Sequence, residues 1–206
     1  MVSPPVDRAP QLEWGVASIA LPGETTSGDL HIVQAFPGGA LMGVVDGLGH
    51  GAEAALAARR AVAELAQHAG ESPIGLVQRS HQALAGTRGV VMSVASYNAR
   101  DHTLTWIGVG NVEGFLVRSD PGARPARESI LLRGGVVGHD LPQLRATVMP
   151  VAPEDTLIFV TDGIRPDFLD DLNLAEAPQP LADLILRQSA KRTDDGLVLV
   201  VRVRPK

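Results

Sequence analysis

The sequence predicts an α+β fold in which strands and helices form separate layers. Runs of strand-like segments are interrupted by one pair of helical segments in the middle of the chain and by a single helical segment near its end. This distribution is typical of a layered sandwich rather than of alternating βαβ units. Hydrophobic residues make up 45% of the chain and aromatic residues only 3%, so Val, Leu, Ile and Ala must fill most of the core, which favours buried sheets covered by alanine-faced helices.

Three strands are predicted in the first quarter of the chain. Residues 12–21 and 28–36 have the alternating apolar pattern of a strand pair, and we expect Trp14 to anchor the core from the first of them. A short apolar run at residues 40–45 predicts the third strand, which leads directly into a glycine-rich turn.

Two helices are predicted next, at about residues 51–69 and 72–85, because apolar residues recur there at helical spacing. Gly70 and Glu71 separate them. Ser72 is expected to cap the second helix, and Pro73 suits a position in its first turn. The alanine-rich faces of both helices allow close packing on a sheet.

The second half of the chain is predicted to be mostly strands. Polar turns separate the expected strands at residues 90–98, 103–109, 112–117 and 129–132, with a further candidate at 144–149. An apolar strand starting at Leu157 leads to Asp162, a helix is expected at about residues 180–190, and the last strand covers residues 197–203.

Size and composition limit the function classes. The 206 residues contain no obvious linker, so we expect a single domain at residues 12–206 behind a flexible, proline-rich arm at residues 1–11. The net charge of −5 and the lack of a Lys/Arg cluster argue against a nucleic-acid surface. No apolar run is long enough for a signal peptide or a membrane span, so we expect a cytoplasmic monomer without membrane contacts.

The absence of cysteine narrows the chemistry further. It excludes disulfides, thiolate metal sites and phosphatase mechanisms that use a Cys nucleophile. The remaining options for catalysis depend on carboxylates or on metals bound by oxygen.

Four acidic turns stand at the ends of predicted strands, at Asp29, Asp46, Asp162 and the pair Asp194-Asp195. The turn at Asp46 is the most distinctive, with the sequence Asp-Gly-Leu-Gly-His-Gly between a strand and a helix. Each turn taken singly could be a hairpin or a helix cap. Taken together, the carboxylates indicate a pair of divalent cations about 3.5–4 Å apart, a common device for cleaving phosphate esters.

The acidic turns and several glycine motifs resemble one protein family in order and approximate spacing. The matching segments are Ser27-Gly28-Asp29, Asp46-Gly47-Leu48-Gly49-His50-Gly51, Gly108-Val109-Gly110-Asn111, Gly134-Gly135-Val136-Val137-Gly138, Thr161-Asp162-Gly163 and Asp194-Asp195-Gly196. They are similar to those of the metal-dependent protein serine/threonine phosphatases of type 2C, in the bacterial sporulation and stress-response branch. Within it, the chain looks most like the small negative-feedback phosphatase of the stressosome.

This resemblance implies a four-layer α-β-β-α sandwich of two antiparallel sheets with helices outside, and two Mn²⁺ or Mg²⁺ ions at one edge. It implies that Asp46 bridges both ions, that the Gly47 carbonyl binds one, that Asp162 and Asp194 hold the other, and that Asp29 completes the set. Asp46 and Asp162 would act through the bridging water. The implied substrates are phosphoserine and phosphothreonine in regulatory proteins, such as stressosome scaffold or sigma-factor regulators.

Several alternatives stay open from sequence alone. Of the adjacent Asp194 and Asp195, we expect one to bind metal and the other to support it, and Asp194 has the matching position. His50 could bind the substrate phosphate or donate to the leaving-group oxygen, or it could only bond to backbone. For the whole protein, the alternative is a non-catalytic phosphoprotein-binding module with the same fold. An aspartyl-phosphate hydrolase is disfavoured because position 48 is Leu.

Overall fold

The computed structural model describes residues 12–170 and 172–204. Within these residues the chain forms two five-stranded sheets, and every pair of neighbouring strands is antiparallel. The arm predicted at residues 1–11 lies outside the described residues.

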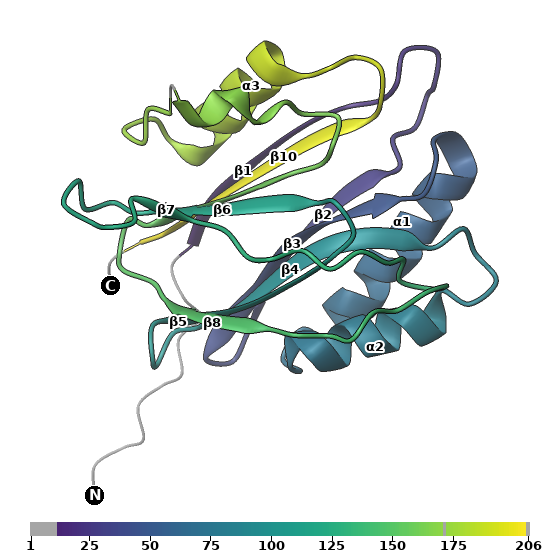
Figure 1. Ribbon diagram of the computed structural model, residues 1–206, viewed down its shortest axis with the longest axis horizontal. Coiled ribbons are helices and arrows are strands. Elements are labelled where there is room, and N and C mark those ends of the chain that lie inside the picture. The colour runs from purple at the N-terminus through teal and green to yellow at the C-terminus, as the bar shows by residue number, and fades with distance from the viewer. Residues whose placement is uncertain (1–11, 171, 205–206) are drawn as a thin grey trace, which may run out of the picture.

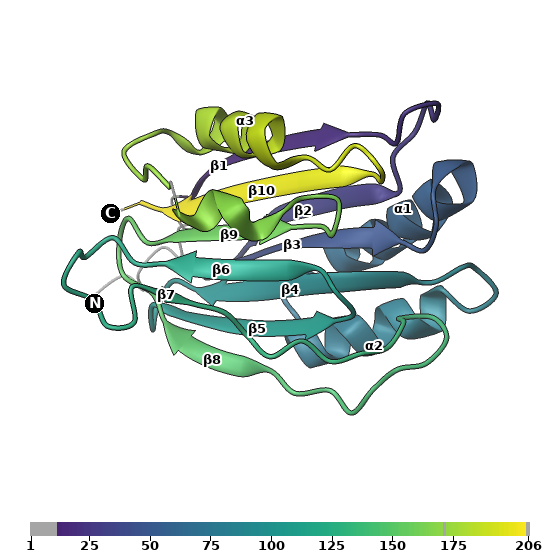
Figure 2. The same cartoon turned by 45° about the horizontal axis from the view of Figure 1, so that its top comes forward.

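The two sheets each combine strands from distant parts of the chain. The first sheet has the order β1 (Leu12–Ile19), β10 (Gly196–Val203), β9 (Thr156–Val160), β6 (Glu113–Val117) and β7 (Arg127–Glu128). The second has the order β2 (Asp29–Phe36), β3 (Gly39–Gly47), β4 (Val90–Asn98), β5 (Thr103–Val109) and β8 (Thr147–Pro150). The sheets pack face to face (Figures 1 and 2), which confirms the predicted sandwich.

Helices cover the outer faces of both sheets. Helices α1 (Gly51–Gln67) and α2 (Pro73–Ala83) lie on the second sheet, and α3 (Pro178–Ser189) lies on the first, close to the short 3-10 helix η1 (Pro166–Asp170) (Figure 1). The predicted cap of α2 is confirmed, because the Ser72 hydroxyl accepts a hydrogen bond from the Gly75 amide at 3.2 Å. No helix within the described part of the chain combines the length and the apolar character that a membrane crossing requires.

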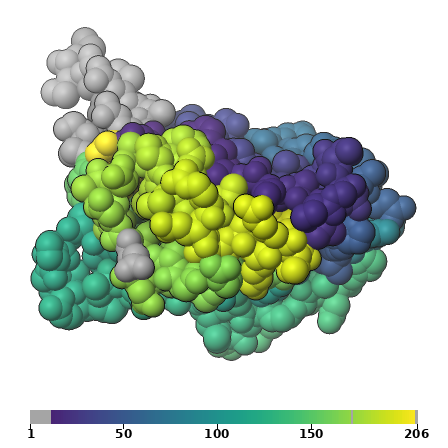
Figure 3. Space-filling view, turned by 90° about the horizontal axis from the view of Figure 1, so that it is seen from above, coloured from purple at the N-terminus to yellow at the C-terminus, as the bar shows by residue number. Residues whose placement is uncertain are grey.

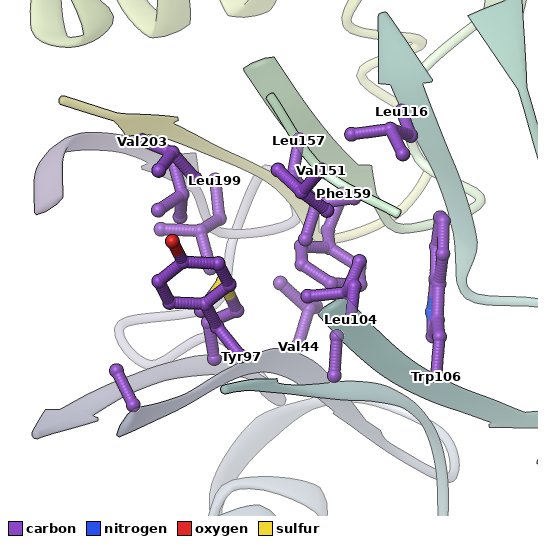
Figure 4. Close-up of a cluster of buried hydrophobic side chains, with 14 of the residues drawn as sticks. Val44, Tyr97, Leu104, Trp106, Leu116, Val151, Leu157, Phe159, Leu199 and Val203 are labelled. Atoms are coloured by element: carbon purple, nitrogen blue, oxygen red, sulfur yellow. The ribbon is translucent and has the colours of Figure 1, made fainter. Parts of the chain in front are cut away.

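The core between the sheets is built mainly from aliphatic side chains around a few rings (Figure 4). Trp106 is fully buried there, donates its Nε1–H to the Ser93 hydroxyl at 2.9 Å and meets the edge of Phe159 at a centroid distance of 5.5 Å. Gly114 lies opposite, and a Cβ at that position would come within 2.0 Å of the indole. Only glycine at position 114 therefore leaves space for this tryptophan.

The expectation that Trp14 anchors the core is wrong. Its side chain is 44% exposed and rests against the His31 ring at a centroid distance of 5.4 Å. The reason is its place on β1, which is an edge strand of the first sheet among residues 12–170 and 172–204. An alternating pattern marks a strand but does not distinguish an edge from a centre.

The strand expected at residues 129–132 is also wrong, because the chain leaves the sheet after β7 at Glu128. It then crosses toward β5, where Arg133 forms backbone hydrogen bonds with Gly108 and Gly110. Leu132 approaches Gly108 closely, since a Cβ at Gly108 would lie 2.4 Å from the leucine side chain. This segment therefore packs beside the second sheet instead of extending the first.

Candidate metal centre

Four strand ends meet at one end of the sandwich and enclose a cavity of about 740 Å³. Asp29 starts β2, Asp46 lies near the end of β3, Asp162 follows β9, and Asp194 precedes β10. All four line this cavity, together with Asp195. Carboxylates that are up to 165 positions apart in the printed sequence are thus brought together by the pairing of the strands.

The register of β2 and β3 places Asp29 directly opposite Asp46. Directly opposed residues of an antiparallel pair have Cβ atoms about 4.5–5.5 Å apart. Like charges at such a distance repel, so these two carboxylates are stable together as anions only if a cation compensates them.

Asp29 also connects the two sheets. The hydroxyl of Thr161 donates a hydrogen bond to Asp29 Oδ2 at 2.7 Å and accepts one from the Leu197 amide at 2.9 Å. Asp29 and Thr161 are both buried. The strand carrying Asp162 is therefore fixed against the strand carrying Asp29 through one threonine.

The electrostatics of the cavity favour a cation. Burial, and secondly the charge of Asp29, raises the pKa of Asp46 from 3.8 to about 8, with the other three acids adding to the effect. Burial also raises the pKa of Asp29 from 3.8 to about 7, although the hydrogen bond from Thr161 lowers it. The charged groups that act on both carboxyls are all acids.

Asp162 is exposed to the cavity and is held by a neighbour from another turn. The Asn111 side chain donates a hydrogen bond from Nδ2 to Asp162 Oδ2 at 2.7 Å. Asn111 follows β5 in the Gly108-Val109-Gly110-Asn111 segment, which resembled the family in sequence but was given no contact with an acidic residue. Its amide leaves the other oxygen of Asp162 free to face the cavity.

Asp194 and Asp195 differ sharply in their surroundings. Asp194 is exposed. Asp195 is 4% exposed, and its two oxygens accept hydrogen bonds from the amides of Leu21 and Gly28 at 2.7 and 2.6 Å. Of the two, Asp194 therefore has the freer carboxylate for an ion.

The glycine-rich loop after Asp46 allows the backbone to pass very close to α1. A Cβ at Gly47 would lie 2.2 Å from the Ala54 carbonyl oxygen, and Gly49 has a φ of +86°. The Gly47 amide donates to the Gly28 carbonyl at 3.1 Å. This bond fixes Gly47 beside the residue that precedes Asp29.

His50 lines the cavity from the end of the same loop, immediately before α1. Its Nδ1 lies 2.7 Å from Glu24 Oε1. A carboxylate is an acceptor, so Nδ1 carries the proton and Nε2 is the nitrogen left for other partners. Sequence reasoning missed Glu24, since it lies 26 positions away in an ordinary polar turn.

The glycine segment at residues 134–138 contributes Gly134 and Val136 to the cavity wall. His139, which follows it, points elsewhere, because its Nε2 bonds to the Thr87 carbonyl at 2.8 Å. His139 is therefore a structural residue that fixes this segment to the loop after α2.

The donor set suits Mg²⁺ or Mn²⁺, which prefer carboxylate, carbonyl and water oxygens. Among the described residues, no group of three or more His, Cys, Asp or Glu side chains is close enough together to hold one metal ion without further ligands. Hard ions of this kind use one or two carboxylates each and keep several waters, so a finished cage is not required. The opposed Asp29 and Asp46, with Asp162 and Asp194 on the same cavity, fit two such ions.

Comparisons with known proteins agree with this fold. Residues 37–204 match the family described as stage II sporulation protein E (SpoIIE). No curated protein matches the chain at a significant level.

Three solved structures illustrate the structural similarity. One, described as "The bacterial stressosome: a modular system that has been adapted to control secondary messenger signaling", is 28% identical over 93% of this chain and 100% of its own, with a TM-score of 0.84. RsbX in complex with magnesium is 19% identical over 95% and 98%, with a TM-score of 0.80. The PP2C phosphatase domain of SpoIIE from Bacillus subtilis, with a fragment of its regulatory domain, is 20% identical over 95% and 64%, with a TM-score of 0.78.

Proposed function

We propose the function of this chain from its family, because the chain belongs to the stage II sporulation protein E (SpoIIE) family of PP2C-type phosphatase domains. The proposed activity is metal-dependent hydrolysis of phosphoserine and phosphothreonine in regulatory proteins. One observation carries the proposal. Asp29 and Asp46 face each other in register on a cavity that Asp162 and Asp194 also line.

The positions of the carboxylates support the following roles. Asp46 and Asp29 would hold the ions from the paired strands, with Asp46 shared between them, and the Gly47 carbonyl would add a ligand from the adjoining turn. Asp162, oriented by Asn111, and Asp194 would hold them from the opposite sheet. When bound, two divalent ions supply an ionised water at neutral pH and neutralise the phosphoryl oxygens.

His50 would contact the substrate. Glu24 holds its Nδ1 at 2.7 Å, which leaves Nε2 to donate a hydrogen bond to the phosphate or a proton to the departing serine or threonine oxygen when the imidazole is protonated.

The proposed partners are phosphorylated regulatory proteins of the stressosome type. Their support comes from the 28% identical structure described with the bacterial stressosome and from the similar folds of RsbX and of the RsbU and RsbW domains of Rv1364c from Mycobacterium tuberculosis. We propose that the chain acts on them as a monomer.

The test is hydrolysis of a phosphoserine peptide by the purified protein. We expect phosphate release with Mn²⁺, none with EDTA, and a loss of at least 100-fold in kcat for Asp46→Asn, which keeps the size of the side chain but removes its charge. Equal rates with and without metal would overturn the mechanism.

The same variant separates an enzyme from a non-catalytic binding module. If the chain is a binding module, the wild-type protein should release no phosphate. Asp46→Asn should then bind a phosphoprotein partner with the same affinity as the wild type. The acidic cavity counts against such a module, because four carboxylates repel a phosphate dianion unless cations are bound.

A further inference from the structure

The carboxylate of Asp195 lies at the junction of the parts that form the candidate metal centre. It is almost fully buried, and each of its oxygens accepts one short hydrogen bond from a backbone amide. The donors are Leu21, 174 positions away, and Gly28, 167 positions away. These two amides stand at the two ends of the loop that joins β1 to β2.

One side chain therefore closes this whole loop. Other hydrogen bonds also hold the loop, from the Glu24 amide to the Leu21 carbonyl at 2.9 Å, from the Asp29 amide to the Ser27 hydroxyl at 3.0 Å and from the Gly47 amide to the Gly28 carbonyl at 3.1 Å, but Asp195 contacts both ends. Figure 1 shows the β1–β2 connection beside the segment that enters β10, and Figure 3 shows the purple early segment against the yellow late segment on the surface.

The loop carries residues from two sides of the site. Gly28 precedes Asp29, and the Gly28 carbonyl accepts the Gly47 amide at 3.1 Å. Glu24, in the middle of the loop, contacts His50 at 2.7 Å. Fixing both ends of the loop therefore fixes Asp29 and the orientation of His50 together.

The backbone of Asp195 is held equally closely on its other side. A Cβ at Gly163 would lie 1.8 Å from the Asp195 carbonyl oxygen, so the Asp162-Gly163 turn packs directly against Asp195. Asp194 is its neighbour in the chain. Asp195 thus contacts or adjoins segments that carry Asp29, Asp162 and Asp194.

We propose that Asp195 is a positioning residue and not a metal ligand: it closes the loop at residues 21–28 and so sets Asp29 and His50 relative to the ions. This inference rests on the proposed metal-dependent function. Both oxygens are committed to buried amides, whereas Asp194 is exposed to the cavity. An ion that recruited Asp195 would have to compete with two charge-assisted hydrogen bonds.

The test is Asp195→Asn compared with Asp194→Asn. Asparagine keeps the size of aspartate but has one acceptor oxygen and one NH₂ group, so it accepts one amide and opposes the other with a donor. In the metal-free protein we expect hydrogen exchange at the Leu21 or Gly28 amide to accelerate at least 10-fold in Asp195→Asn. In Asp194→Asn both amides should exchange as in the wild type.

Mn²⁺ binding supplies the second measurement. Calorimetry should show two ions in Asp195→Asn with about 10–100-fold weaker affinity, as is usual when a residue supporting a ligand is lost. Asp194→Asn should bind one ion fewer. Excess Mn²⁺ should restore the hydrolysis rate of Asp195→Asn toward the wild-type value and leave Asp194→Asn inactive.

Loss of one bound ion in Asp195→Asn would overturn the proposal, as would unchanged exchange together with unchanged Mn²⁺ affinity. If this variant does not fold, hydrogen exchange in the wild-type protein tests the proposal instead. The Leu21 and Gly28 amides must then exchange far more slowly than the amide of Thr25, an exposed residue of the same loop. Exchange as fast as that of Thr25 would contradict the closed loop. Two bound ions without phosphopeptide hydrolysis would refute the proposed function and leave this inference intact.

Discussion

The metal-free protein should lose stability as the pH rises from 5 to 8, because Asp29 is buried and Asp46 lies half-buried opposite it. The pKa of Asp46 is raised by burial from 3.8 to about 8, and that of Asp29 to about 7. In the unfolded chain both groups ionise near pH 4. The folded state therefore binds more protons than the unfolded state between about pH 4 and 8, and its stability falls across this window.

The size of the effect follows from the shift. One pKa unit corresponds to about 1.4 kcal/mol, and nearly the whole range from pH 5 to 8 lies between the pKa of Asp46 in the unfolded chain, 3.8, and its pKa in the folded chain, about 8. Asp46 alone therefore lowers the free energy of unfolding by about 4 kcal/mol. Asp29 acts in the same direction. A domain is stable by only about 5–15 kcal/mol, so this loss should be obvious.

The assay is urea unfolding at pH 5, 6.5 and 8 with EDTA, repeated at pH 8 with excess Mn²⁺. We expect Mn²⁺ to restore stability, because an ion that binds only the folded state stabilises it. Asp46→Asn should reduce the pH dependence to the part that Asp29 contributes, while Asp183→Asn, at an exposed position on α3, should leave it unchanged. Metal-free stability that is constant or rises from pH 5 to 8 would refute this reasoning.

Three further predictions concern single contacts. Asn111→Ala should weaken Mn²⁺ binding by about 10-fold in calorimetry, because the variant loses the 2.7 Å hydrogen bond to Asp162. Unchanged affinity would contradict the role of Asn111 in orienting Asp162. Glu24→Gln and His50→Gln should lower kcat for a phosphoserine peptide by similar factors, and the double variant should be no slower than the worse single one, whereas multiplying effects would show that they act separately. Trp106→Ala should lower the free energy of unfolding by about 3–5 kcal/mol in urea titrations, and a loss below about 1 kcal/mol would contradict its place in the core.

Local sequence signals predicted most individual elements of the fold. Ser72 and Pro73 marked the start of α2 correctly because capping depends on residues within one turn. The apolar runs of β9 and β10 were clear for the same reason. The pairing of β1 with β10 could not be derived from such signals, since it depends on contacts between the two ends of the chain.

The errors have a similar origin. Trp14 belongs to a genuine strand, but its exposure depends on the edge position that β1 has among the described strands, which is a property of the whole sheet. The segment at residues 129–132 is apolar enough for a strand. It does not extend the first sheet, because the backbone of Arg133 forms hydrogen bonds with Gly108 and Gly110 at the end of β5. The hydrophobic pattern of the sequence alone predicts neither the exposure of Trp14 nor the path of this segment.

The site shows the same division between local and tertiary information. The four acidic turns stood out in the sequence because each ends or begins an apolar strand, and the structure brings them to one cavity. Among the residues that hold them, Thr161 and Asn111 lie in segments that resembled the family, but their contacts were not predicted, and Glu24 did not stand out. Thr161, Asn111 and Glu24 matter because of which turn each one faces, and only the folded chain determines that.

The most direct test of the central claim is a Mn²⁺ titration followed by electron paramagnetic resonance. Two ions that share Asp46 would lie about 3.5–4 Å apart and would be magnetically coupled. We predict that the spectrum of an exchange-coupled Mn²⁺ pair develops at two ions per chain and is absent in Asp46→Asn. Spectra of isolated ions only, at every ratio of metal to protein, would contradict a shared pair of ions in this cavity.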